Sequence, residues 1–85
     1  MRVVLYTIGR PCPLCDDAWA HLERIRRRCP FELERVVIDG DPRLVVRHAL
    51  RVPVVEIDGR EALFGRVDGA ALEAMLLRGM GPGCA

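Results

Sequence analysis

The distribution of apolar and polar positions along the chain predicts four strands and three helices. The predicted strands, which are continuously apolar or alternate with polar residues, span residues 3–8, 31–38, 52–57 and 60–64. The predicted helices, in which apolar residues recur at helical spacing, span residues 13–29, 42–50 and 69–78. The pair Asp58-Gly59, between the last two strands, is the strongest short signal for a hairpin.

The order strand, helix, strand, helix, strand, strand, helix predicts an α/β fold. A right-handed crossover makes the first two strands parallel, and the hairpin adds an antiparallel pair. The expected result is a thioredoxin-like arrangement (β-α-β-α-β-β-α), a four-stranded mixed sheet with helices on both faces. We assign residues 1–78 to this single domain and residues 79–85, which are rich in glycine, to a flexible C-terminal tail.

The same pattern predicts which helical positions are buried. In the first helix, the expected apolar face consists of Leu14, Ala18, Leu22, Ile25 and Cys29. In the last helix, it consists of Ala71, Leu72, Met75 and Leu76. We expect His21 and His48 to be ordinary residues of helix surfaces.

Composition narrows the class of protein. Hydrophobic residues make up 51% of the 85 residues and charged residues 29%, which is typical of a folded domain rather than a disordered chain. The net charge of +1 is too small for the surface of a nucleic-acid or membrane binder, and no apolar run approaches the ~20 residues of a bilayer span. Because the N-terminus lacks the pattern of an export signal, we expect a cytoplasmic protein. We also expect the protein to be a monomer.

The sequence Cys12-Pro13-Leu14-Cys15 lies where the first strand passes into the first helix, with Cys12 at the cap and Pro13 at the first helical position. Residues three apart in a helical turn rise about 4.5 Å, within the Cα separation of a disulfide, so this pair can close and open. The unpaired amides of the helix N-terminus favour the thiolate of Cys12. We therefore expect Cys12 to attack a substrate disulfide, and Cys15, one turn further and closer to the core, to resolve the mixed disulfide.

Charged residues near the two cysteines are expected to shift the pKa of Cys12 in opposite directions. Arg10 adds a cation, whereas Asp16 and Asp17 add negative charge in the first turn of the helix. The simplest role of the two acids is to neutralise the positive end of the helix, and a proton relay through Asp16 is the alternative. The sequence leaves the net effect on Cys12 open.

A structural metal site is the main competing use of two cysteines at this spacing. Its second half is missing, because neither Cys29 nor Cys84 has a ligand partner two or three positions away. We therefore predict redox exchange and no metal site. Cys29 fits a small buried apolar residue, whereas Cys84 is expected to be exposed, where it would form adventitious disulfides or serve as a third functional thiol.

The dithiol at the first strand-to-helix junction, together with Val52-Pro53 at the start of the third strand, resembles the thioredoxin fold. Within that fold, the sequence Cys-Pro-Leu-Cys-Asp at 12–16 is similar to a group of small bacterial glutaredoxin-like proteins, and the resemblance covers roughly residues 2–77. It implies that Pro53 is a cis-proline facing the dithiol and that the backbone of Val52 pairs with a bound thiol substrate. Taken alone, the sequence also allows a trans proline at the start of an edge strand.

The resemblance also implies contacts to a small thiol such as glutathione. The stretch similar to the glutaredoxin segment that holds the γ-glutamyl end of glutathione consists of Gly65, Arg66, Val67 and Asp68. The other expected substrate contacts are Arg10, Pro13, Leu14, Arg51 and Val52. A helix cap explains Asp68 equally well.

Three departures from the glutaredoxin pattern weaken the assignment to glutathione. Arg51 replaces a threonine, Leu14 replaces an aromatic residue, and Arg10 lies one position closer to the cysteine. Arg51 and Arg66 could instead bind the carboxylates of another low-molecular-weight thiol.

The leading hypothesis is a thiol-disulfide oxidoreductase of glutaredoxin-like type, with Cys12, Cys15 and Pro53 as its catalytic residues. It needs no tightly bound cofactor, and its substrate is a disulfide in a protein or mixed with a small thiol. Its electron donor is glutathione, another low-molecular-weight thiol, or a reductase. Two alternatives stay open: a non-catalytic thioredoxin-fold binding or adaptor module, and a soft-metal chaperone that uses the same two cysteines.

Overall fold

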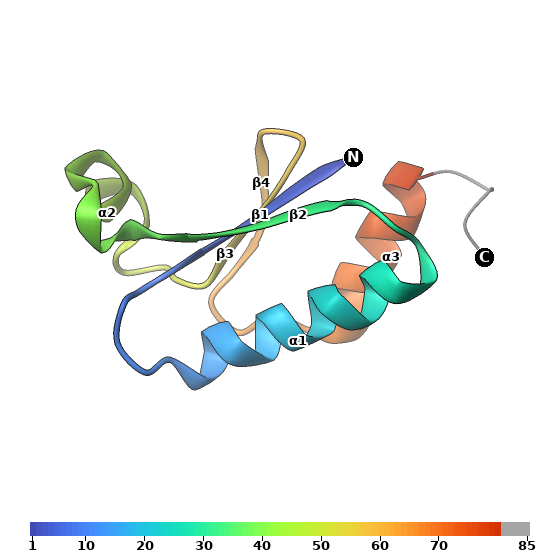
Figure 1. Ribbon diagram of the computed structural model, residues 1–85, viewed down its shortest axis with the longest axis horizontal. Coiled ribbons are helices and arrows are strands. Elements are labelled where there is room, and N and C mark those ends of the chain that lie inside the picture. The colour runs from blue at the N-terminus through green and yellow to red at the C-terminus, as the bar shows by residue number, and fades with distance from the viewer. Residues whose placement is uncertain (81–85) are drawn as a thin grey trace.

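The structure of the protein, a computed structural model, describes residues 1–80 and contains the predicted elements in the predicted order (Figure 1). The strands are β1 (Arg2–Thr7), β2 (Glu32–Val37), β3 (Val54–Ile57) and β4 (Arg60–Phe64). The helices are α1 (Pro13–Arg28), α2 (Pro42–His48) and α3 (Gly69–Met80), with a 3-10 turn, η1 (Ile38–Gly40), before α2. Because α3 continues through Gly79 to Met80, these two residues are helical rather than part of the expected tail, and the rest of that tail lies outside the described residues.

The strands form one mixed sheet in the order β2-β1-β3-β4, which confirms the predicted α/β fold. β1 is parallel to β2 and antiparallel to β3, and β3 is antiparallel to β4. Asp58 and Gly59 have positive φ angles of 49° and 84°, as a type I′ hairpin turn requires. The Arg2 amide donates to Asp58 Oδ1 at 2.9 Å, which ties the turn to the start of β1.

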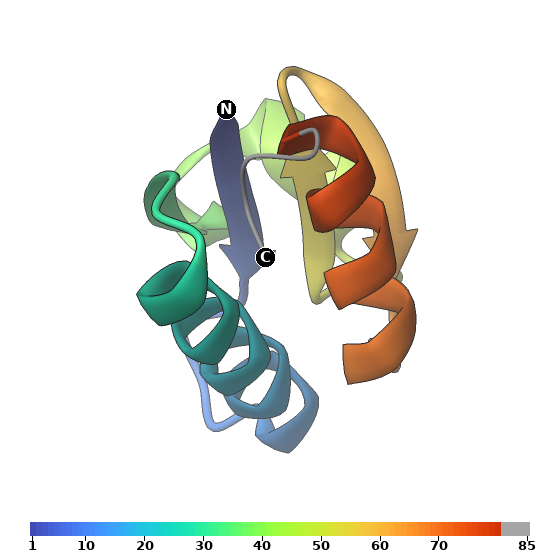
Figure 2. The same cartoon turned by 90° about the vertical axis from the view of Figure 1, so that its right-hand side faces the viewer.

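Helices cover the two faces of the sheet unequally (Figure 2). α1 and α3 lie on one face and bury the main core, which consists of Val3, Leu5, Ala18, Leu22, Ile25, Val55, Val67, Leu72 and Leu76. The short helix α2 lies on the other face, at the end of the sheet where β1 finishes (Figure 1). No helix formed by residues 1–80 combines the length and the apolar character that crossing a membrane requires.

α1 begins and ends where its sequence predicts. Cys12 is the N-cap residue, and the arginines of the last turn, at 26–28, lie at the negative end of the helix dipole. The buried face of the helix consists of Cys15, Ala18, Leu22 and Ile25, followed by Cys29 at the C-cap. The burial predicted for Cys29 is confirmed, since it is 1% exposed.

Three predictions about burial are wrong. Leu14 is 36% exposed, because the helical spacing of the buried positions starts from Cys15 instead. Ala71 is exposed on α3. His48, expected on a surface, is 2% exposed, because it lies on the side of α2 that faces the sheet, and its ring stacks on Tyr6 with the centroids 4.5 Å apart.

α1 and α3 approach each other closely at Gly69, the first residue of α3. A Cβ atom at this position would lie 2.7 Å from both Cε1 and Nδ1 of the His21 ring. Further along, Arg28 and Glu73 form an ion pair of 2.5 Å that joins the same two helices. The closeness of α1 to α3 therefore depends on the absence of a side chain at Gly69.

Candidate active site

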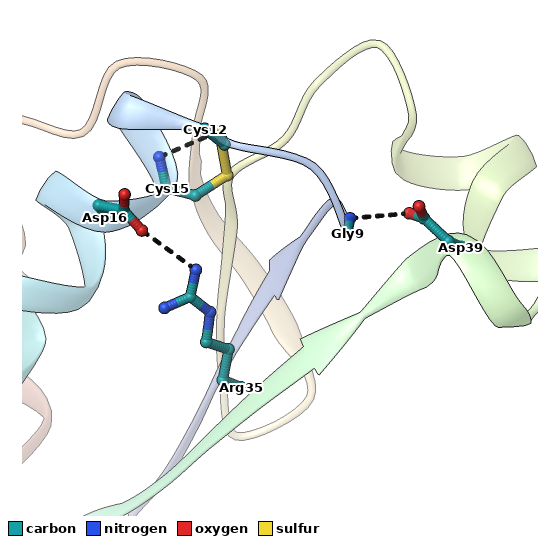
Figure 3. The surroundings of a disulfide bond; sticks show 6 residues. All are labelled: Gly9, Cys12, Cys15, Asp16, Arg35 and Asp39. Atoms are coloured by element: carbon teal, nitrogen blue, oxygen red, sulfur yellow. Dashed lines mark hydrogen bonds and ion pairs between the residues drawn. A yellow bond between two sulfur atoms is a disulfide. The ribbon is translucent and has the colours of Figure 1, made fainter.

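Cys12 and Cys15 form a disulfide at the start of α1 (Figure 3). Their Cα atoms are 5.2 Å apart, within the range that disulfides adopt, and the Cys15 amide donates to Cys12 Sγ at 3.2 Å. Cys15 is completely buried, whereas Cys12 is only half-buried. A substrate can therefore reach Cys12 but not Cys15, which is the asymmetry that the expected roles of the two thiols require.

The local sequence explains why a helix begins at this point. Pro13 suits the first helical position because its missing amide would have no partner there. Cys12 has an extended backbone, with φ −141° and ψ 94°, and its sulfur accepts the amide hydrogen that an oxygen accepts at most helix caps. The positive end of the helix dipole therefore lies at this sulfur.

The acid next to Cys15 is paired with a residue that sequence analysis did not identify. Arg35 of β2 donates from Nη2 to Asp16 Oδ1 at 3.3 Å (Figure 3), and its guanidinium lies 5.6 Å from the centre of the Trp19 ring. The pairing places the guanidinium of Arg35 beside the first turn of α1, next to the dithiol.

The loop from β1 to the dithiol is anchored by Asp39 of η1. The Gly9 amide donates to Asp39 Oδ1 at 3.2 Å (Figure 3). A Cβ atom at Gly9 would lie only 2.9 Å from Asp39 Oδ2, so a larger residue would force the exposed Asp39 carboxylate to move and would disturb this hydrogen bond. The sequence offers no signal for this contact, because Asp39 followed by Gly40 is equally typical of a turn that touches nothing else.

The Val52–Pro53 peptide bond is cis, as the resemblance implied. Pro53 is buried at the start of β3. The antiparallel register pairs Tyr6 with Val54, which places Pro53 beside Thr7 at the end of β1. Because the loop to the dithiol leaves from the end of β1, the structure brings Pro53 and the dithiol to the same end of the sheet.

Hydrogen bonds around Pro53 join two of the segments predicted to bind substrate, residues 51–53 and residues 65–68. The Gly65 amide donates to the carbonyl oxygens of Arg51 and Pro53, at 3.0 and 2.8 Å. The Val52 amide donates to the His48 carbonyl at 3.0 Å, so it is already engaged. The carbonyl oxygen of Val52, unlike those of Arg51 and Pro53, accepts no hydrogen bond from the described residues. The expected backbone pairing with a substrate would use that oxygen.

Two of the expected small-thiol contacts have structural partners instead. Arg51 forms an ion pair with Glu61, and its guanidinium lies 4.2 Å from the centre of the Phe64 ring. Asp68 Oδ1 accepts a hydrogen bond of 2.9 Å from the Ala70 amide, in the manner of a helix cap for α3.

The remaining expected contacts differ in their exposure. The side chain of Val67 belongs to the core, so only its backbone can face a ligand. Arg66 is exposed after the turn at Gly65, whose φ of 71° favours glycine. Pro13 and Leu14 are exposed beside Cys12.

A shallow hollow of about 370 Å³ lies between the dithiol loop and α2. Its lining residues are Ile8, Arg10, Ile38, Asp39, Val45 and Ala49. Arg10, predicted to bind substrate, has no acidic partner in the described part of the chain. The hollow therefore presents an unpaired cation two residues before Cys12.

A second hollow of about 400 Å³ lies on the sheet face that α2 leaves uncovered. Tyr6 and Glu56 line it, and the Tyr6 hydroxyl donates to Glu56 Oε1 at 3.3 Å. Partial burial, together with the Glu56 carboxylate, raises the pKa of Tyr6 above its usual value. Among residues 1–80, neither ring nitrogen of the neighbouring His48 has a hydrogen-bond partner, and burial lowers the pKa of His48. We therefore expect both rings to be uncharged near neutral pH.

Among residues 1–80, no three cysteine, histidine or carboxylate side chains lie close enough together to hold a metal ion. Cys84, for which we expect an exposed position, lies outside the described residues.

Comparison with known proteins gives a matching family. The family model described as a glutaredoxin-like domain (DUF836) matches residues 2–77, nearly the whole chain. No curated protein matches the chain.

Solved structures share the architecture. The structural genomics target protein XcR50 from X. campestris is 36% identical with a TM-score of 0.73, and the match covers 87% of this chain and 93% of that chain. Protein Ne2328 from Nitrosomonas europaea is 29% identical with the same TM-score of 0.73, over 87% and 88% of the two chains. Thioredoxin 1 from Thermosipho africanus is 15% identical with a TM-score of 0.58, over 89% and 94%, which shows a common thioredoxin fold.

Proposed function

The chain belongs to the family of glutaredoxin-like domains, and from this premise we propose that it is a dithiol-disulfide oxidoreductase with the Cys12/Cys15 pair as its redox centre. The observation that carries the proposal is the unequal exposure of two cysteines that are bonded across the first turn of a helix. A structural disulfide does not require an accessible sulfur at a helix N-terminus, whereas a catalyst of disulfide exchange does.

The proposed reaction has two exchange steps. The Cys12 thiolate attacks one sulfur of the substrate disulfide, forms a mixed disulfide with that half, and releases the other half as a thiolate, which takes up a proton. Cys15 then loses its proton and attacks Cys12 Sγ, which releases the second half as a thiol and closes the Cys12–Cys15 disulfide. The substrate gains the electrons and protons that the dithiol loses. Pro53 and the Val52 carbonyl, at the same end of the sheet, hold the substrate backbone.

The proposal extends to partners and location. The protein would act as a monomer in the reducing cytoplasm, without a tightly bound cofactor, on a disulfide in a protein or mixed with a small thiol. Glutathione, another low-molecular-weight thiol, or a reductase would return electrons to the disulfide. Arg51 is paired with Glu61, and Asp68 accepts the Ala70 amide, so fewer groups are free to bind glutathione. These contacts favour a protein disulfide as the substrate.

A single-turnover experiment with prereduced protein and bis(2-hydroxyethyl) disulfide tests this function. The wild-type protein should release free thiol and close the Cys12–Cys15 disulfide, identified by peptide mass. Cys12→Ser keeps a good helix cap and should abolish the reaction, whereas Cys15→Ala should stop it at a mixed disulfide on Cys12. Thiol release by Cys12→Ser at the wild-type rate would refute the assignment.

A further inference from the structure

The end of α2 and the turn after it expose an aliphatic surface that the proposed chemistry does not use. Val46 is 88% exposed, Leu50 is 100% exposed and Val45 is 37% exposed. Together with Ala49, which is also exposed, these residues form what we call the α2 patch. Clustered aliphatic side chains on the surface of a small protein are typical of a site that binds a partner.

The α2 patch adjoins the redox centre. Val45 and Ala49 line the hollow of about 370 Å³ whose lining also includes Arg10, two residues before Cys12. Leu50 lies three residues before Pro53, on the segment that leads to the sheet end shared with the dithiol. A polypeptide with its disulfide at Cys12 therefore has the α2 patch within reach of the residues that flank that disulfide.

The charges around the α2 patch favour an acidic partner. Arg10, Arg43 and Arg47 are exposed, and none of them has an acidic partner in the described part of the chain. The two acids of the same region each accept a backbone amide, Asp39 from Gly9 and Asp41 from Arg43 at 2.9 Å. The region therefore carries three guanidinium groups against two carboxylates, an excess of one positive charge on the loop and helix that bear the aliphatic residues.

We propose that the substrate is a protein whose reacting disulfide is flanked by an acidic and aliphatic segment, and that this segment docks on the α2 patch. The inference rests on the proposed function and names its substrate class. A small thiol has too few atoms to cover both the dithiol and the four aliphatic residues of the patch, so a polypeptide is the occupant that accounts for both. Contacts with Arg43 and Arg47 orient the segment, while the exchange at Cys12 and Cys15 follows the two steps given above.

Two short synthetic peptides provide the probe. They share the same aliphatic residues but carry either glutamates or lysines around a single cysteine, which is joined by a disulfide to thionitrobenzoate. Attack of the Cys12 thiolate on the peptide sulfur releases the coloured thionitrobenzoate anion, and Cys15 then displaces the peptide thiol. The mixed disulfide of 2-mercaptoethanol with thionitrobenzoate, which is too small to reach the patch, serves as the reference substrate.

Prereduced wild-type protein should react with the acidic peptide roughly 10-fold faster than with the basic peptide at low ionic strength, and the ratio should fall as salt is added. Arg43→Glu/Arg47→Glu should remove or invert this preference. The control Arg26→Glu/Arg27→Glu, which changes the charge equally at the far end of α1, should keep it. Val46→Ser/Leu50→Ser, at two exposed positions that the fold does not need, should slow both peptides without slowing the reference substrate.

The outcomes separate the two proposals. If the reference substrate reacts but the peptides react equally, or if Arg43→Glu/Arg47→Glu leaves the preference intact, the docking inference is overturned and the oxidoreductase function stands. If none of the three disulfides reacts with the prereduced protein, both are overturned. Circular dichroism of each variant confirms that the fold is retained.

Discussion

Replacing Gly69 with alanine should destabilise the protein, although alanine normally favours a helix. The new Cβ atom would meet Cε1 and Nδ1 of the His21 ring at 2.7 Å and its Cγ at 3.2 Å, well inside van der Waals contact. Overpacking of this kind costs about 1–3 kcal/mol, and the helical gain from replacing glycine offsets at most about 1 kcal/mol of it. With the helical gain realised in full, we expect a net loss of up to about 2 kcal/mol. Each kcal/mol lowers Tm by roughly 4–8 °C in a domain of this size.

A double-mutant cycle shows whether the His21 ring causes the loss. In a His21→Ala background the alanine at position 69 has room, so Gly69→Ala should become neutral or stabilising by up to about 1 kcal/mol. Urea unfolding followed by circular dichroism measures all four proteins. If Gly69→Ala is as stable as the wild type, or destabilises both backgrounds equally, the close approach of α1 and α3 is not what requires glycine here.

Three further predictions concern single contacts. Because burial lowers the pKa of His48 below its ordinary 6.5, the unfolded chain binds a proton at higher pH than the folded protein does, so the free energy of unfolding should fall as the pH drops below about 6.5. His48→Phe should lose this component of the pH dependence in urea titrations, and an unchanged profile would contradict the burial. Gly9→Ala and Asp39→Ala should each cost about 1 kcal/mol through the bond that they share, so combining them should cost no more than either alone, whereas additive losses would mean independent roles. Asp68→Ala should destabilise α3 by about 0.5–2 kcal/mol while Asp68→Asn should not, and equal losses in thermal unfolding would show that the charge rather than the cap matters.

The parts of the fold that depend on local chemistry could be predicted from the sequence. Pro13 after Cys12 predicts the start of α1, and the Asp41 carboxylate caps α2 by accepting the Arg43 amide at 2.9 Å, as its position before a proline suggests. Apolar periodicity predicted the strands, because each buried face repeats at the period of its element. The dithiol could also be recognised from local sequence, since both its cysteines belong to one helical turn.

The contacts that surround the dithiol could not be predicted, because they depend on the register of the sheet. Arg35 reaches Asp16 only because β2 pairs in parallel with β1 beneath α1. Asp39 reaches Gly9 in the same way, from the segment that follows β2. His48 was misplaced because a helix as short as α2 has too few turns for a clear apolar stripe, and no local signal shows which side faces the sheet.

The central claim is that Cys12 and Cys15 form a redox couple, and a redox titration in dithiothreitol buffers tests it most directly. Alkylation followed by peptide mass reports the state of this pair separately from the other two cysteines. The account predicts a reversible two-electron couple between about −180 and −280 mV, in the range of exchange catalysts. A pair that stays reduced throughout, or that binds metal before it oxidises, would contradict it.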